Sequence, residues 1–131
     1  MDKLLVEHGD RICTLTFNRS AVRNALDRET FDALTEALAC AEREDGVSAV
    51  VLQGAGGHFS AGNDLNDFLR PRPAGDSPGM RFLRQLAGMT KPIVAAVEGS
   101  AQGIGVTLLL HCDFVVADPG AGAGIDVGIL A

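Results

Sequence analysis

Two segments of this chain share one design, in which a short apolar run is followed by glycines and then by the start of a helix. The first lies between Val50 and Leu65, and the second between Ile93 and Gly105. A helix start leaves backbone N–H groups unpaired, and glycine lets a ligand approach the backbone closely. Two such segments facing one point would supply a pair of donors for a developing oxyanion. Either glycine run alone is equally typical of a tight turn.

The spacing of apolar residues predicts alternating strands and helices, and therefore a single α/β domain with right-handed crossovers. We expect Gly9-Asp10 to form a hairpin turn, and Asp27 and Asp64 to cap the helices that follow them. The expected elements, in chain order, are a hairpin at 3–18, a helix at 27–44, a buried strand at 49–52, a short helix at 64–69, a loop at 71–79, a helix at 80–89, a buried strand at 92–97, a buried helix at 103–110 and a strand at 114–117.

Charge and composition exclude several classes of protein. The formal net charge of −6 argues against a nucleic-acid partner, which needs a basic patch. The longest apolar run is too short to span a bilayer, and the N-terminus lacks the apolar core of a signal peptide. The three cysteines form no CxxC pair, so neither a disulfide framework nor a zinc site is expected. We expect a cytoplasmic protein with reduced thiols, no metal and no membrane partner.

The second glycine segment also resembles the nucleotide loop of short-chain dehydrogenases, because Gly99, Gly103 and Gly105 follow an apolar run. Three observations argue against that interpretation. The loop comes late in the chain rather than after a first strand, and the acidic residue expected further on is absent. The chain also contains no tyrosine, which those enzymes use as an acid.

Five motifs together resemble the crotonase (enoyl-CoA hydratase/isomerase) superfamily in order and spacing. They are Arg23-Asn24-Ala25-Leu26, Phe59 to Leu65, Lys91 to Gly99, Gly103-Ile104-Gly105 and Cys112-Asp113. The resemblance implies the N-terminal half of a crotonase-like ββα spiral (the ClpP/crotonase fold). It implies an acyl-CoA-binding core at 1–118, followed at 119–131 by an irregular tail or incomplete segment.

The resemblance also assigns roles by position. The backbone N–H groups of Asn63 and Ile104 would form an oxyanion hole for a thioester carbonyl. Coenzyme A would be part of the substrate, so no separate cofactor is implied. Arg23 and Ala25 would line its path, and the Ala61 carbonyl would face its adenine. The implied substrate-binding residues are Arg23, Ala25, Ser60, Ala61, Gly62, Gly103 and Phe82, the last following a substrate loop at 71–79 and contacting the acyl chain together with Leu83.

One position departs from the pattern of the family's hydratases. They carry a glutamate two residues after the third glycine of the second loop, where this chain has Thr107, a poor general base. The run from Gly103 to Leu110 is instead similar to Δ3,Δ2-enoyl-CoA isomerases, which shuttle a proton with one carboxylate. Asp126 is the only carboxylate in the segment where the resemblance implies that group, and we do not assign it the role.

The function that the resemblance implies is therefore a Δ3,Δ2-enoyl-CoA isomerase, in which the oxyanion hole stabilises a thioester enolate. Two alternatives stay open: an enoyl-CoA hydratase or another crotonase activity, and a non-catalytic acyl-CoA-binding fragment. The resemblance further implies a homotrimer or hexamer for the full-length protein.

Overall fold

The computed structural model describes residues 2–71 and 74–119, and in this part of the chain the strands form one mixed sheet. The strands are β1 (Leu4–Gly9), β2 (Ile12–Phe17), β3 (Ala49–Gly54), β4 (Ile93–Val97) and β5 (Phe114–Ala117). Their order across the sheet is β1-β2-β3-β4-β5, with β1 and β2 antiparallel and the later pairs parallel. The predicted α/β class is confirmed.

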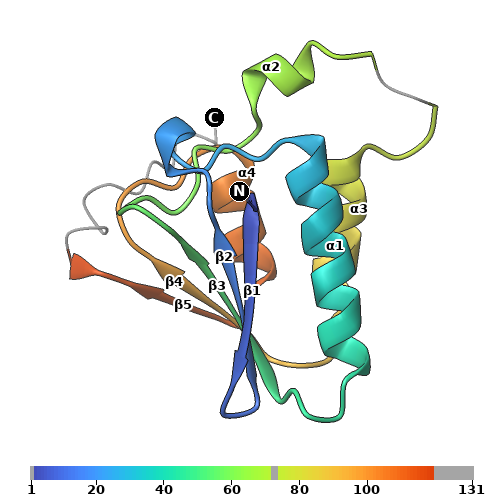
Figure 1. The fold of residues 1–131 in the computed structure, drawn as a ribbon, viewed down its shortest axis with the longest axis vertical. Coiled ribbons are helices and arrows are strands. Elements are labelled where there is room, and N and C mark those ends of the chain that lie inside the picture. Colours follow the sequence, from blue (N-terminus) through green and yellow to red (C-terminus); the bar gives the residue numbers. More distant parts are fainter. Residues whose placement is uncertain (1, 72–73, 120–131) are drawn as a thin grey trace.

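The helices lie mainly on one side of this sheet, as Figure 1 shows. They are the short η1 (Ser20–Val22), α1 (Arg28–Arg43), α2 (Leu65–Phe68), α3 (Pro78–Ala87), α4 (Ile104–Thr107) and the short η2 (Leu108–His111). The two longer helices, α1 and α3, pack against each other, and η2 packs against α3. No helix in the described ranges is long and apolar enough to cross a membrane.

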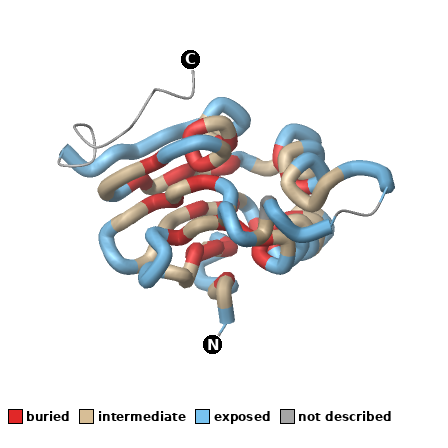
Figure 2. The backbone as a smooth tube through the Cα atoms, turned by 90° about the horizontal axis from the view of Figure 1, so that it is seen from above, coloured by how far each residue is buried: buried red, intermediate tan, exposed pale blue. Residues whose placement is uncertain are grey.

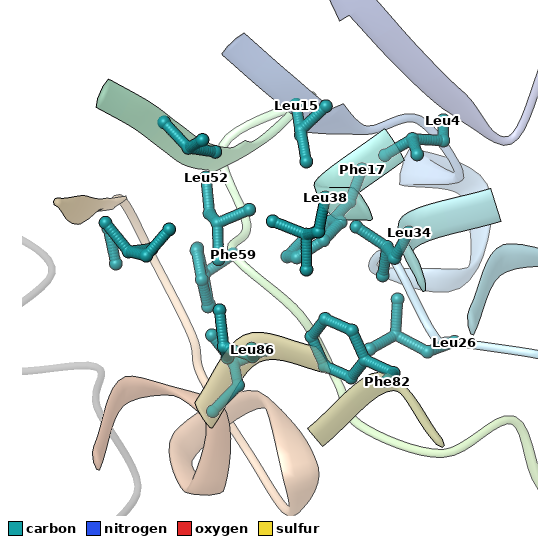
Figure 3. Packing of buried hydrophobic residues seen from close by; sticks show 14 of the residues in the cluster. Leu4, Leu15, Phe17, Leu26, Leu34, Leu38, Leu52, Phe59, Phe82 and Leu86 are labelled. Carbon is teal, nitrogen blue, oxygen red and sulfur yellow. The ribbon is translucent and has the colours of Figure 1, made fainter. Parts of the chain in front are cut away.

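The core lies between the sheet and the two longer helices, where Figure 2 shows the buried residues gathered. Along β2, β3 and β4 every second side chain points into it, because alternate side chains of a strand face opposite sides. In Figure 3, Leu15 and Leu52 from the sheet belong to one cluster with Leu38 of α1 and Leu86 of α3. The runs at 49–52 and 92–97 are therefore strands as predicted, but only one face of each is fully buried.

The hairpin turn lies one residue later than predicted. Gly9 still pairs with Ile12, so the two turn residues are Asp10 and Arg11, whose φ values are 53° and 66°. Two consecutive positive φ values are typical of the type I′ turn, which matches the twist of a hairpin. The Arg11 side chain is held in place by Ser48, because its Nε donates to the serine Oγ at 2.8 Å.

The predicted helix at 27–44 is α1, and Asp27 is its N-cap as expected. The Asp27 carboxylate accepts a hydrogen bond from the Thr30 N–H at 2.9 Å, which satisfies one of the unpaired donors of the first turn. At the other end Lys91 Nζ donates to the carbonyl oxygens of Ala41 and Glu44, at 2.6 Å and 2.5 Å. A cation at this end also complements the helix dipole.

The other predicted helices differ in their bounds. Helix α3 starts at Pro78 rather than Met80, since Ser77 accepts a hydrogen bond from the Met80 N–H at 3.2 Å and acts as its N-cap. The predicted loop at 71–79 is therefore shorter, and its residues 72–73 lie outside the described part. The buried helix predicted at 103–110 is α4 followed by η2, and its Leu110 is 72% exposed.

Strand β5 forms one edge of the sheet and differs from the other parallel strands in its exposure. All four of its residues are exposed, with Phe114 at 63% and Val116 at 61%. Apolar strand residues normally lie against a second layer, so this edge is the least covered part of the sheet. The tail or incomplete segment predicted at 119–131 lies outside the described residues from 120 onward.

Candidate active site

The loops that follow β3 and β4 lie side by side and are hydrogen-bonded to each other. The Ser60 N–H donates to the Ser100 carbonyl at 3.2 Å, and the Gln102 N–H donates to the Ser60 carbonyl at 2.9 Å. Ser60 and Ala101 consequently form a parallel bridge between the loops. The two predicted donors occupy matching places, because Asn63 and Ile104 each lie three residues after this bridged pair.

Glycines allow this close approach. Gly62 has a φ of +90°, and a Cβ atom there would lie 2.8 Å from the Gln102 carbonyl oxygen of the other loop. Gly105, in α4, faces the first loop, where a Cβ atom would lie 2.8 Å from the Ser60 carbonyl oxygen. Real side chains do not tolerate such distances to backbone oxygen, so both positions need glycine for the loops to touch.

The Asn63 N–H is free of any partner among the described residues, and the backbone around it explains why. Leu26 binds the chain on either side of Asn63: its N–H donates to the Gly62 carbonyl at 2.7 Å, and its carbonyl accepts from the Asp64 N–H at 3.0 Å. Successive peptide groups of an extended chain point to opposite sides. The Asn63 N–H therefore points away from Leu26 and stays available to a ligand.

The Ile104 N–H is also free within the described part of the chain, for a different reason. Ile104 is the first residue of α4, and the next N–H groups find carbonyls: Gly105 donates to Gln102 at 2.8 Å and Val106 to Gly103 at 3.0 Å. The first N–H of a helix has no carbonyl one turn earlier to bind. Gly103, with a φ of 56° and a ψ of −129°, turns the chain into the helix.

Asn63 and Ile104 line the same cavity, which has a volume of about 340 Å³. This volume falls near the lower end of small-molecule sites. Its walls come from α1, α2, α3, the start of α4 and the loop before α2. Its lining residues are Arg28, Phe31, Asp32, Asn63, Asp67, Ser77, Pro78, Gly79, Met80, Arg81, Leu83 and Ile104. Two unpaired donors on residues that line one mainly apolar cavity can hold a carbonyl oxygen and bury the group attached to it.

The charged residues of the cavity form ion pairs with each other. Arg28 Nε lies 3.1 Å from Asp67 Oδ1, and Arg81 lies 3.0 Å from Asp32. Because each carboxylate has an arginine partner, the cavity contains no isolated charge among the residues that line it. Within the described residues, no cluster of three histidine, cysteine or acidic side chains is arranged to hold a metal ion.

The chain matches a known protein family over most of its length. Residues 7–127 match the family model described as enoyl-CoA hydratase/isomerase. The chain belongs to the enoyl-CoA hydratase/isomerase family. The predicted membership of the crotonase superfamily is thereby confirmed.

The relatives of the chain in this family carry out different reactions. The chain is 38% identical to 1,2-epoxyphenylacetyl-CoA isomerase of Escherichia coli, covering 89% of this chain and 48% of the relative. It is 36% identical to human enoyl-CoA delta isomerase 2, covering 88% of this chain and 31% of the relative. Other relatives are named as hydratases and dehalogenases.

A crystal structure of an enoyl-CoA hydratase/isomerase from Pseudoalteromonas atlantica superposes with a TM-score of 0.87 at 42% identity, covering 92% of this chain and 48% of that one. The likeness confirms the crotonase fold. The chain spans about half the length of this structure and of the first bacterial relative, which agrees with the predicted N-terminal half.

Two residues within the family motifs prove to hold the loops in place. The buried Asn24 amide donates to the carbonyls of Ala55 and His58, at 2.9 Å and 2.8 Å, and accepts from the Arg19 N–H at 2.9 Å. Ser60, predicted to bind substrate, is fully buried, and its hydroxyl donates to the Asn24 carbonyl at 2.9 Å. The structure therefore gives Ser60 a positioning contact, and sequence reasoning assigned no role to Asn24.

The other residues predicted to bind the substrate lie either near the two loops or in the core. Arg23 is exposed and its guanidinium has no partner among the described residues, while the Ala61 N–H donates to the Arg23 carbonyl at 2.9 Å, so Arg23 and Ala61 lie together beside the loops. Ala25, half-buried, accepts from Arg19 at 2.6 Å. Phe82 is 0% exposed and lies in the core (Figure 3). There it packs on Phe31, and Leu83 rather than Phe82 lines the cavity.

Other polar groups near the two loops already have partners or are kept unreactive by burial. The Thr107 hydroxyl donates to the Gly103 carbonyl at 3.3 Å, and Thr107 does not line the cavity. Burial raises the pKa of the Cys112 thiol to about 11, which keeps it protonated and unreactive at neutral pH. Asp64 caps α2 as predicted, by accepting from the Asn66 N–H at 2.9 Å. Asp126 lies outside the described residues.

Proposed function

We propose that the protein is an acyl-CoA enzyme, and specifically a Δ3,Δ2-enoyl-CoA isomerase. The observation that carries the proposal is the pair of free N–H groups, on Asn63 and Ile104, at the wall of one cavity. Hydrogen bonds from both to a thioester oxygen would stabilise negative charge on that oxygen. This charge develops when a proton leaves the adjacent carbon, so the site favours chemistry through an enolate.

Isomerase rather than hydratase activity is supported by Thr107. Hydration needs a second acid/base group over the acyl chain, and Thr107 stands where the family's hydratases, by resemblance, carry a glutamate. Its hydroxyl is bound to a backbone carbonyl. Isomerisation needs only one group that moves a proton between two carbons of the substrate. Human enoyl-CoA delta isomerase 2, among the relatives, has a name that agrees with this reaction.

The remaining parts of the proposal follow from the family. The acyl-CoA substrate would carry its own coenzyme A past Arg23, Ala25 and Ala61, with Gly62 and Gly103 setting the approach to the backbone donors. No metal or separate cofactor takes part. The full-length protein is proposed to be a cytoplasmic homotrimer or hexamer without a nucleic-acid or membrane partner.

The test removes one donor and leaves the rest of the residue's surroundings unchanged. Ile104→Pro deletes the N–H at the first position of α4, where proline fits a helix, and Ile104→Ala keeps the N–H as the matched control. With a 3-enoyl-CoA, the absorbance of the conjugated thioester product measures isomerisation. We expect the proline variant to lose about 3–4 kcal/mol of transition-state stabilisation and the alanine variant far less. Equal rates in both variants would contradict the proposal, and water addition to crotonyl-CoA by the wild type would favour a hydratase.

A further inference from the structure

Gly79 occupies an unusual place in the wall of the cavity. It lies in the first turn of α3, just after Pro78, and is one of the cavity's lining residues. Its φ is not in the positive range, so the backbone conformation does not require glycine. Glycine is also less favourable than alanine within a helix. What glycine provides at this position is therefore open space that a side chain would fill.

That space lies between α1 and the second loop. A Cβ atom on Gly79 would lie 3.5 Å from two ring atoms of Phe31 and 3.7 Å from Ile104 Cδ1. These are ordinary van der Waals distances, so a methyl group fits without displacing its neighbours. A longer side chain would extend between the Phe31 ring and the Ile104 side chain, both of which line the cavity.

Ile104 links this space to the proposed chemistry. Its N–H is one of the two proposed donors, and its side chain ends near Gly79. An acyl group whose carbonyl oxygen is held at that N–H would extend into the cavity that Ile104 lines. The apolar residues that line the same cavity include Leu83 of α3 and Phe31 of α1.

We propose that Gly79 determines the length and bulk of the acyl group that the site accepts. The missing side chain leaves room beside Phe31 for a chain longer than butyryl, such as octanoyl. The proposal rests on the proposed function, since it takes the cavity as the acyl site. It adds a residue that selects among acyl-CoA substrates without taking part in the chemistry.

The experiment compares Gly79→Leu and Gly79→Ala with the wild-type protein. Calorimetry measures the dissociation constants of coenzyme A, butyryl-CoA, hexanoyl-CoA and octanoyl-CoA. We expect Gly79→Leu to weaken octanoyl-CoA binding at least about tenfold, which is what a small change in an apolar pocket is worth. Binding of coenzyme A and butyryl-CoA should change little. Gly79→Ala should shift the profile in the same direction by a smaller factor.

Gly88→Leu is the matched control for placing a leucine on the same helix. Gly88 ends α3, is exposed and does not line the cavity, so the chain-length profile of this variant should match the wild type. If Gly79→Leu fails to fold, the Gly79→Ala profile decides, because its methyl group fits the space that is present.

The outcomes separate this proposal from the proposed function. A wild-type protein that binds every acyl-CoA, with Gly79 variants that keep the same chain-length profile, overturns the role of Gly79 alone. A uniform weakening of all four ligands overturns it as well, because that result reflects general damage. A wild-type protein that binds none of the ligands overturns the proposed function and this inference together.

Discussion

Asn24 joins three parts of the chain that meet next to the candidate site. Its amide connects the backbone at Arg19, Ala55 and His58, and its carbonyl binds the Ser60 hydroxyl. The residue is 0% exposed and has a φ of 59°, a conformation that asparagine adopts more readily than most residues. One side chain thus fixes the loop that follows β3 against the segment that leads into α1.

Replacing Asn24 should therefore destabilise the fold through the lost amide. Asn24→Gly keeps the left-handed backbone but leaves two carbonyls and one N–H, all partly buried, without their partner, so we expect a loss of about 2–3 kcal/mol. Arg23→Gly is the matched control, because Arg23 has a φ of 53° and an exposed side chain. Its effect should stay within about 1 kcal/mol. Urea unfolding measures both, and equal losses would show that the amide network contributes little.

Asp27 gives the fold a defined dependence on pH. Burial alone would raise the pKa of its carboxyl, but hydrogen bonds from Lys3 and Thr30, with Arg19 nearby, outweigh burial and lower the pKa to about 2. The unfolded chain has the ordinary value of 3.8. The charged form is thus favoured by folding, and this stability is present above pH 4 and is lost as the pH falls toward 2.

Asp27 should affect how the free energy of unfolding changes with pH, rather than its absolute value. Between pH 5 and pH 2 the wild-type protein should lose on the order of 2 kcal/mol more than Asp27→Asn, which has no carboxyl to protonate. Chemical unfolding at a series of pH values measures the difference between the two proteins. Parallel curves through this window would mean that Asp27 titrates alike in the folded and unfolded chains.

At the scale of elements, the site depends on two loops held in register rather than on any one helix. The bridge between Ser60 and Ala101 sets the register, and the glycines at 62 and 105 let the backbones meet. A displacement of one loop would separate the two N–H groups, and a shift of about 1 Å can reduce a rate by about a hundredfold.

Gly62→Ala tests this dependence, with Gly57→Ala as its matched control. The two glycines have similar φ values, +90° and +84°, but a Cβ atom on Gly62 meets the Gln102 carbonyl whereas one on Gly57 meets nothing within 4 Å. Both variants should lose about 1–2 kcal/mol of stability from the strained backbone. We expect only Gly62→Ala to weaken acetoacetyl-CoA binding, by about tenfold or more in calorimetry. Equal affinities in the two variants would count against the close approach of the loops.

Some helix ends could be predicted from the local sequence, whereas other helix ends and the hairpin turn were misplaced. The cap of α1 was predictable because Asp27 precedes a clear apolar stripe. The start of α3 carried an equally good signal, Ser77 followed by Pro78, but the prolines and glycines around it suggested a loop as far as residue 79. The hairpin turn was placed a residue early because Gly9-Asp10 is a common turn pair, whereas pairing with Ile12 fixed the turn at Asp10 and Arg11.

At the scale of the whole molecule, the family motifs predicted the fold and the two backbone donors, but not the walls of the cavity. Arg28 and Asp32 share a face of α1 because they are four residues apart, but nothing in the local sequence brings Asp67 of α2 to the same cavity. Phe82 and Leu83 were predicted as a pair, and only the orientation of α3 decides that one faces the core and the other the cavity. Such contacts depend on how helices pack, which local patterns do not encode.

The order of the strands has a consequence for how the chain is made. Each strand from β2 to β5 pairs with the strand that precedes it in the sequence, so the order in space repeats the order in the chain. During synthesis the N-terminal parts of a protein emerge and fold first. Every new strand can therefore join an edge that already exists, and among the described residues β5 is the last strand to join and forms an exposed edge.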